Sequence, residues 1–164
     1  SGQAGREAWI ILRLNNLVDA ARIEKLYEAS RAGVRIQLII RGICSLIPGV
    51  NGMSENIEVR SIVGRYLEHA RLLVFGNHGQ PDYFISSADW MTRNLDRRVE
   101  VSVPIRDPQL QSECAAYLDL QLRDNTKTRI IDADMDNHFV QRKKGEPQVD
   151  VQMEMFNFYN SNLG

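Results

Sequence analysis

Hydrophobic and polar residues follow one another along the first 40 positions in a pattern that predicts a strand, a helix and a second strand. Residues 8–14 form a nearly continuous apolar run, as in a buried strand. Apolar positions at helical spacing over residues 20–32 predict a helix that ends at Gly33, and residues 34–40 return to a strand pattern. Because one helix joins two strands over so short a stretch, the strands should be parallel and connected by a right-handed crossover.

The rest of the chain continues this succession of elements. The pattern predicts a long helix from Pro108 to about residue 125, and strands at residues 57–63, 72–75, 83–86, 98–105, 127–131 and 139–140. No internal repeat, low-complexity tract or linker rich in proline, glycine or serine interrupts the sequence. The expected fold is therefore α/β, with residues 1–164 as a single domain in which helices flank a mixed β-sheet.

Composition and charge exclude several classes of protein. The formal net charge is −1, whereas a general nucleic-acid binder is usually strongly basic, so nucleic acid is not an expected partner. No apolar stretch approaches the roughly 18 residues of a membrane span. Cys44 and Cys114 belong to no Cys-x-x-Cys pair, which fits a reducing cytoplasm. The Ser-Gly start is untypical of a native protein, so we expect a piece of a longer cytoplasmic chain.

Common catalytic motifs are missing from the sequence. There is no Gly-x-x-x-x-Gly-Lys-[Ser/Thr] phosphate loop, no Gly-x-Gly-x-x-Gly after the first strand, and no Gly-x-Ser-x-Gly elbow. The alternating acids of residues 132–136 resemble the start of an EF-hand loop, but Asn137 stands at its glycine position and Lys143 at its closing glutamate position. This segment is interpreted as a solvated turn. His78 and His138 also lie in predicted turns and are expected to be exposed bystanders.

Arginine and histidine are the candidates for chemistry. Arginine provides 16 of the 20 basic residues, and its planar fork suits phosphate, although a lineage bias in codon usage explains this count equally well. His69 directly precedes the strand at 72–75, and Arg41 follows another strand; α/β sheets usually bind ligands at strand ends. A lone histidine is more often structural than catalytic. Arg98 and Glu100 should share one face of their strand and would need a partner or a ligand if buried.

Several segments of the chain resemble a known family. His69-Ala-Arg71, followed by Ser86-Ser-Ala-Asp89, resembles a degraded phospholipase D signature, His-x-Lys and then Gly-Ser-x-Asn. Longer strings resemble the C-terminal domain of bacterial polyphosphate kinases, which is the second phospholipase D-like domain of those proteins. These strings are residues 14–19 (LNNLVD), 40–44 (IRGIC), 60–69 (RSIVGRYLEH) and 86–100 (SSADWMTRNLDRRVE). The resemblance runs through essentially the whole chain.

The resemblance implies a specific activity and specific partners. Polyphosphate kinases are ATP-polyphosphate phosphotransferases that reversibly transfer the terminal phosphate of ATP to inorganic polyphosphate. They use magnesium, and a phosphohistidine carried by another domain is the intermediate. ATP, ADP and polyphosphate are thus the implied ligands, and the remaining domains of the same chain are implied partners. The family also leaves open a homo-oligomer and peripheral membrane association of the full-length protein.

The resemblance also implies which residues act. Carried over position by position, the catalytic histidine is His69, and the contacts to ATP and phosphate fall on Arg41, His69, Arg98 and Glu100. The ligands of Mg²⁺ are expected outside this chain, and the 164-residue chain by itself is expected to be inactive. From the residues themselves, we expect Glu68 to orient the ring of the neighbouring histidine.

Two other functions stay open at the level of sequence. A phospholipase D-like phosphodiesterase or phosphatidyltransferase would need the lysine and asparagine of the signature, but Arg71 and Asp89 stand at these positions. The charge of Arg71 is instead expected to attract phosphate towards His69. A non-catalytic module that only binds polyphosphate is the second alternative.

Overall fold

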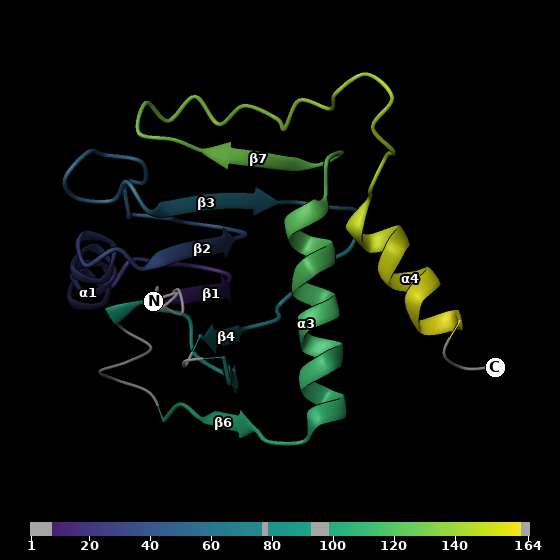
Figure 1. Ribbon diagram of the computed structural model, residues 1–164, viewed down its shortest axis with the longest axis horizontal. Helices are drawn as coiled ribbons and strands as arrows, with labels where there is room; N and C mark the ends of the chain where they lie inside the picture. Colours follow the sequence, from purple (N-terminus) through teal and green to yellow (C-terminus); the bar gives the residue numbers. More distant parts are fainter. Residues whose placement is uncertain (1–7, 77–78, 93–98, 162–164) are drawn as a thin grey trace, which may run out of the picture.

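The computed structural model describes residues 8–76, 79–92 and 99–161. These residues build a seven-stranded mixed sheet in the order β6-β5-β4-β1-β2-β3-β7 (Figure 1). Its strands are, in chain order, Trp9–Leu14 (β1), Arg35–Ile40 (β2), Ile57–Ile62 (β3), Leu72–Phe75 (β4), Asp82–Ser86 (β5), Ser102–Ile105 (β6) and Thr128–Ile131 (β7). The described helices are Ala20–Arg31 (α1), Pro108–Arg123 (α3) and Val151–Ser161 (α4).

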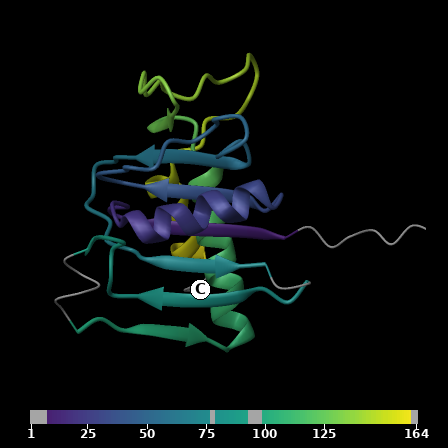
Figure 2. The same ribbon diagram turned by 90° about the vertical axis from the view of Figure 1, so that its left-hand side faces the viewer.

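Strand directions bring many segments to one edge of the sheet. β1, β2 and β3 are parallel, whereas β4 is antiparallel to β1, β5 to β4, and β6 to β5. The ends of β1, β2, β3 and β5 therefore lie beside the starts of β4 and β6, on the left-hand side of the sheet in Figure 2. We call this side, where the strand ends lie, the C-terminal edge; it is not one of the edge strands β6 and β7. The residues that directly follow or precede the strands here are Asn15, Arg41, Arg71 and Ser87.

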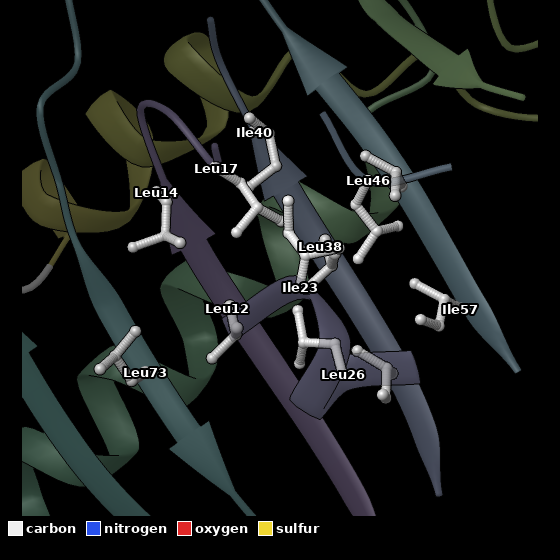
Figure 3. Packing of buried hydrophobic residues seen from close by; sticks show 12 residues of the cluster. Leu12, Leu14, Leu17, Ile23, Leu26, Leu38, Ile40, Leu46, Ile57 and Leu73 are labelled. Atoms are coloured by element: carbon white, nitrogen blue, oxygen red, sulfur yellow. The ribbon is translucent and has the colours of Figure 1, made fainter. Parts of the chain in front are cut away.

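Helix α1 covers one face of the sheet. Asp19 caps the helix, since its side chain accepts a hydrogen bond from the backbone N–H of Arg22 at 3.0 Å, and Gly33 follows it with a φ of +87°. Ile23 and Leu26 of the helix are buried against apolar side chains of β1 and β2 (Figure 3). This packing fixes the βαβ unit and, with it, the ends of both parallel strands.

Helices α3 and α4 cover the opposite face. Leu118 of α3 and Val151 of α4 belong to a second buried cluster with Ile39, Ile62 and other residues of the sheet. The first turn of α4 is tied to the end of α3, because Asp124 accepts a hydrogen bond from the backbone N–H of Val151 at 2.9 Å. Burial by itself raises the pKa of Asp124, but this bond and further donors from the following turn outweigh it and lower the pKa.

The predicted α/β class, the parallel βαβ unit and the strands expected at 72–75 and 83–86 are confirmed, and the last two pair as antiparallel β4 and β5. The strand expected at 98–105 is wrong at its start, because β6 begins only at Ser102. The backbone N–H of Ser87 still donates to the carbonyl oxygen of Val101 at 2.9 Å, but the N–H of Val101 donates to Oγ of Ser87 at 3.0 Å instead of to a backbone carbonyl. The regular pairing of β5 with β6 therefore begins only at Ser102. Among the described residues, none of the helices has the length and apolar character needed to span a membrane.

Candidate functional site

Two asparagines directly after β1 organise the C-terminal edge. The backbone N–H of Gly42 donates to the carbonyl oxygen of Asn15 at 2.7 Å, and the N–H of Ile43 donates to Oδ1 of Asn16 at 2.9 Å. A Cβ atom at Gly42 would lie 2.5 Å from that Oδ1 atom and 3.0 Å from the Asn15 carbonyl oxygen. Glycine is therefore needed here for close packing against the asparagine turn.

A buried ion pair joins the start of β4 to the loop after β5. The side chain of Asp89 is only 6% exposed, and its Oδ1 atom lies 3.1 Å from Nε of Arg71. Oδ1 also accepts from the backbone N–H of Asn15 at 2.9 Å, and Oδ2 accepts from Nδ2 of Asn16 at 3.1 Å. Burial raises the pKa of Asp89, but these hydrogen bonds, with Arg71 foremost, outweigh it and lower the pKa. Arg71 is thus compensated by Asp89, contrary to the expectation that its charge attracts phosphate.

We expect Asp89→Asn to lower the free energy of unfolding of the 164-residue chain by about 2–3 kcal/mol at pH 7, because Arg71 loses its carboxylate partner. A carboxyl with a lowered folded-state pKa stabilises the fold above its ordinary pKa, and this contribution is lost as the pH falls through the lowered value. The difference between variant and wild type should therefore shrink below about pH 4. Urea unfolding at pH 7 and pH 3 measures the difference in free energy of unfolding between wild type and variant. The same difference at both pH values would contradict the role of the ion pair.

His69 lies at this edge with its ring held by Asn15. The amide of Asn15 is 3.1 Å from Nδ1 of His69 and 3.2 Å from Nη2 of Arg71. A guanidinium can only donate, so the hydrogen-bond network assigns the Asn15 oxygen to this side and its nitrogen to the carbonyl oxygen of Glu68, 3.1 Å away. Nδ1 of His69 then donates its hydrogen to the Asn15 oxygen, which leaves Nε2 as the ring nitrogen that takes no part in this contact.

The expectation that Glu68 orients this ring is wrong. Its carboxylate turns towards the helices below the sheet, where Oε1 lies 3.4 Å from the hydroxyl of Tyr117 and from Nε2 of Gln121. In the part of the chain that the structure describes, the ring contact of His69 is made by Asn15. The sequence signal for this role is the pair of adjacent asparagines directly after the first parallel strand.

Arg41 follows β2 at the same edge, as predicted. Its backbone N–H donates to the carbonyl oxygen of Leu14 at 3.2 Å, which ties the start of its loop to the end of β1. Within residues 8–76, 79–92 and 99–161, its half-buried guanidinium has no hydrogen-bond or ion-pair partner. Arg41 is thus a cation free to bind an anion, unlike Arg71.

Glu100 and Arg98 differ in what the structure says of them. Glu100 lies two residues before β6, so the strand alternation expected for it does not apply. Its Oε2 atom accepts a short hydrogen bond from Oγ of Ser87, which places it at the C-terminal edge next to the loop that carries Asp89. Arg98 lies outside the described residues.

Within the described residues, the carboxylates of Asp89 and Glu100 at this edge are both engaged by other groups of the chain. Asp89 is occupied by Arg71 and two asparagines, and Glu100 by Ser87. Among described residues, side chains of ligand type come together at Asp132, Asp136 and His138, but these follow β7 at the opposite edge of the sheet.

The fold is that of the phospholipase D family. A phospholipase D family member, Nuc from Salmonella typhimurium, superposes with a TM-score of 0.57 over 76% of this chain and 82% of that chain. Its sequence is only 14% identical, so the likeness concerns the fold alone.

Sequence comparison identifies the family within this fold. The chain belongs to the family of the polyphosphate kinase C-terminal domain 2, whose model matches residues 1–152. Polyphosphate kinase from Vibrio vulnificus (strain YJ016) is 54% identical over 142 residues, which are 87% of this chain and 20% of that protein. The crystal structure of polyphosphate kinase from Porphyromonas gingivalis has a TM-score of 0.92 and 42% identity, covering 96% of this chain and 24% of that chain. The chain thus spans about a fifth of the length of the curated relatives it matches.

Proposed function

We propose that this chain forms one wall of the phosphoryl-transfer site of a polyphosphate kinase. The full-length protein would move the terminal phosphate of ATP reversibly onto inorganic polyphosphate. A histidine in another domain would carry the phosphoryl group between the two, and magnesium would be held with the nucleotide phosphates by ligands outside this chain. Support comes from the family of the chain and from its similarity to polyphosphate kinases along nearly its whole length.

The observation that carries the proposal is that Arg41 and His69 lie at the same edge of the sheet, one after β2 and the other before β4. Arg41 offers a cation with no partner among the described residues, and His69 offers an exposed ring with its Nδ1 atom fixed by Asn15. Phosphoryl transfer depends mainly on neutralising charge and aligning the groups that exchange the phosphate. The guanidinium would bind phosphate oxygens in a bidentate manner, and His69 would donate a proton from Nε2 to a phosphate oxygen or stabilise its charge.

The paired state of Arg71 argues against phosphodiester chemistry. In the signature that this chain resembles, a lysine and an asparagine stand where Arg71 and Asp89 form their ion pair. A cation already bound to a buried carboxylate is a weaker phosphate ligand, since the carboxylate competes for the same donors. We therefore favour phosphotransfer over a phosphodiesterase or phosphatidyltransferase.

Incubation of the full-length gene product with ATP labelled at the γ-phosphate tests the proposal. We expect acid-insoluble polyphosphate to form, and to be converted back to ATP when ADP is added. Cleavage of a phosphodiester without polymer would favour the phospholipase D-like alternative. Binding of polyphosphate with neither reaction would favour the non-catalytic module.

The 164-residue chain alone should fold but make no polyphosphate. Its buried clusters on both faces of the sheet provide a complete core, whereas no second histidine of the chain stands in a comparable arginine-rich setting. Cooperative thermal unfolding of the purified chain, together with absence of polymer synthesis, is the expected result. Polymer formation by this chain alone would contradict a site shared between domains.

A further inference from the structure

The segment between β3 and β4, which carries His69, is held by a side chain from α4. Residues 63–71 form neither helix nor strand. Oε1 of Gln152 accepts a hydrogen bond from the backbone N–H of Tyr66 at 3.0 Å, and Nε2 donates to the carbonyl oxygen of the same residue at 2.8 Å. One side-chain amide thus satisfies both backbone groups of a residue 86 positions away, as a neighbouring strand would.

Gly64 makes this close approach possible. A Cβ atom at Gly64 would lie 2.5 Å from both Cδ and Oε1 of Gln152. The backbone of Gly64 is outside the left-handed region, so space and not conformation requires the glycine. Because the obstructing atoms are the end of a flexible side chain, an alanine here would displace the amide of Gln152 and leave the backbone allowed.

We call the contacts of Gln152 with the backbone of Tyr66 and with Gly64 the clamp. Its contacts continue towards His69 through Glu68. Nε2 of Gln152 lies 3.4 Å from Oε2 of Glu68, whose other oxygen faces Tyr117. Burial raises the pKa of Tyr117 to about 12, so its hydroxyl stays a donor to the carboxylate. The carbonyl of Glu68 in turn contacts the Asn15 amide that fixes the histidine ring. Gln152 itself is fixed, since the N–H of the preceding Val151 is bound by buried Asp124.

We infer that Gln152 is a positioning residue for His69 and that Gly64 is the complementary half of its clamp. The inference rests on the proposed function, because it assigns His69 the role given there. Gln152 acts through the backbone of the segment and touches no reacting atom. Without the clamp, the segment would move relative to Asn15, and Nε2 of His69 would no longer be aligned with the phosphate bound by Arg41.

A double-mutant cycle in the full-length gene product tests the clamp. We expect Gln152→Ala and Gly64→Ala each to lower kcat for polyphosphate synthesis at least about tenfold, with the KM for ATP changed less than about twofold. The double variant should be no worse than either single variant, because truncating Gln152 to its Cβ atom leaves room for the new methyl group at position 64. Asn157→Ala, an exposed position on the same helix, should retain wild-type kinetics.

The background variant His69→Gln separates positioning from general stability. Gln152→Ala should cause no further loss of kcat in that background, whereas a merely structural effect would add to it. Full activity of Gln152→Ala beside an inactive His69→Gln would overturn the inference and leave the proposed function intact. Failure of the wild-type product to make polyphosphate would instead overturn the proposed function and this role with it. Additive losses of kcat in the cycle of Gln152→Ala and Gly64→Ala would also contradict the proposed role of the clamp.

Discussion

His69→Gln in the full-length gene product should lower the rate of polyphosphate synthesis by about 10²-fold or more, as loss of a general acid or base typically does. Glutamine has a similar length and keeps one hydrogen-bonding edge towards Asn15, but its amide cannot act as a general acid or base. The ring has its Nδ1 atom fixed by Asn15, so Nε2 is the nitrogen left to exchange a proton with the substrate. Initial rates with ATP labelled at the γ-phosphate measure the loss.

The chain contains a matched control for this variant. His138 is exposed, and its Nε2 atom lies 3.3 Å from Asp136 in the turn after β7, at the edge opposite His69. His138→Gln should therefore keep wild-type rates, and the same holds for His78→Gln from the sequence, although His78 lies outside the described residues. Circular dichroism confirms that each variant is folded. A fully active His69→Gln would return this histidine to a structural role.

The sequence predicted the fold in most of its parts because local patterns encode them. The apolar run before Asn15, the capping residue Asp19 and the glycine at position 33 each mark an element boundary by side-chain chemistry alone. The start of β6 was missed because it depends on a tertiary contact. Ser87 takes the N–H of Val101, and no pattern within residues 98–105 reveals that interaction.

The candidate site was predictable in position but not in its hydrogen bonding. Arg41 and His69 both lie next to predicted strand ends, where α/β sheets usually bind ligands. They share one edge because β2 is parallel and β4 antiparallel to β1, so the end of β2 and the start of β4 lie on the same side of the sheet. The residues next to His69 in the sequence did not reveal which side chain contacts its ring. Consecutive residues in an extended segment point in opposite directions, so Glu68 reaches the helices below while His69 meets Asn15 in the turn after β1.

The same limit applies to the arginines. Arg41 and Arg71 are indistinguishable by residue type and by their place at strand ends, yet one is free among the described residues and the other is bound to Asp89. The difference comes from a carboxylate 18 positions away in sequence, which the fold brings within 3.1 Å of Arg71. Counting arginines therefore indicates phosphate chemistry, but only the structure separates an arginine without a partner among the described residues from one that is held in an ion pair.

Arg41→Lys provides the second large effect that we expect. Lysine keeps the positive charge but replaces a planar fork by a single ammonium group, so one of two charge-assisted hydrogen bonds to phosphate is lost. Such a bond contributes about 1.5–3 kcal/mol, which corresponds to a roughly 10- to 100-fold fall in kcat/KM for ATP. The melting temperature should change little, because the guanidinium stabilises no partner within the described part of the chain.

Arg35→Lys is the matched control, since Arg35 begins the same strand β2 that Arg41 follows and lies exposed at the opposite edge of the sheet. Both variants carry the same chemical change at opposite ends of β2, Arg35 at its exposed start and Arg41 in the half-buried position directly after it. Kinetics and thermal melts of the two, run side by side, therefore distinguish phosphate binding from a general cost of replacing arginine. Near-wild-type kinetics for Arg41→Lys, or equal losses for both variants, would show that Arg41 does not bind the substrate through its fork.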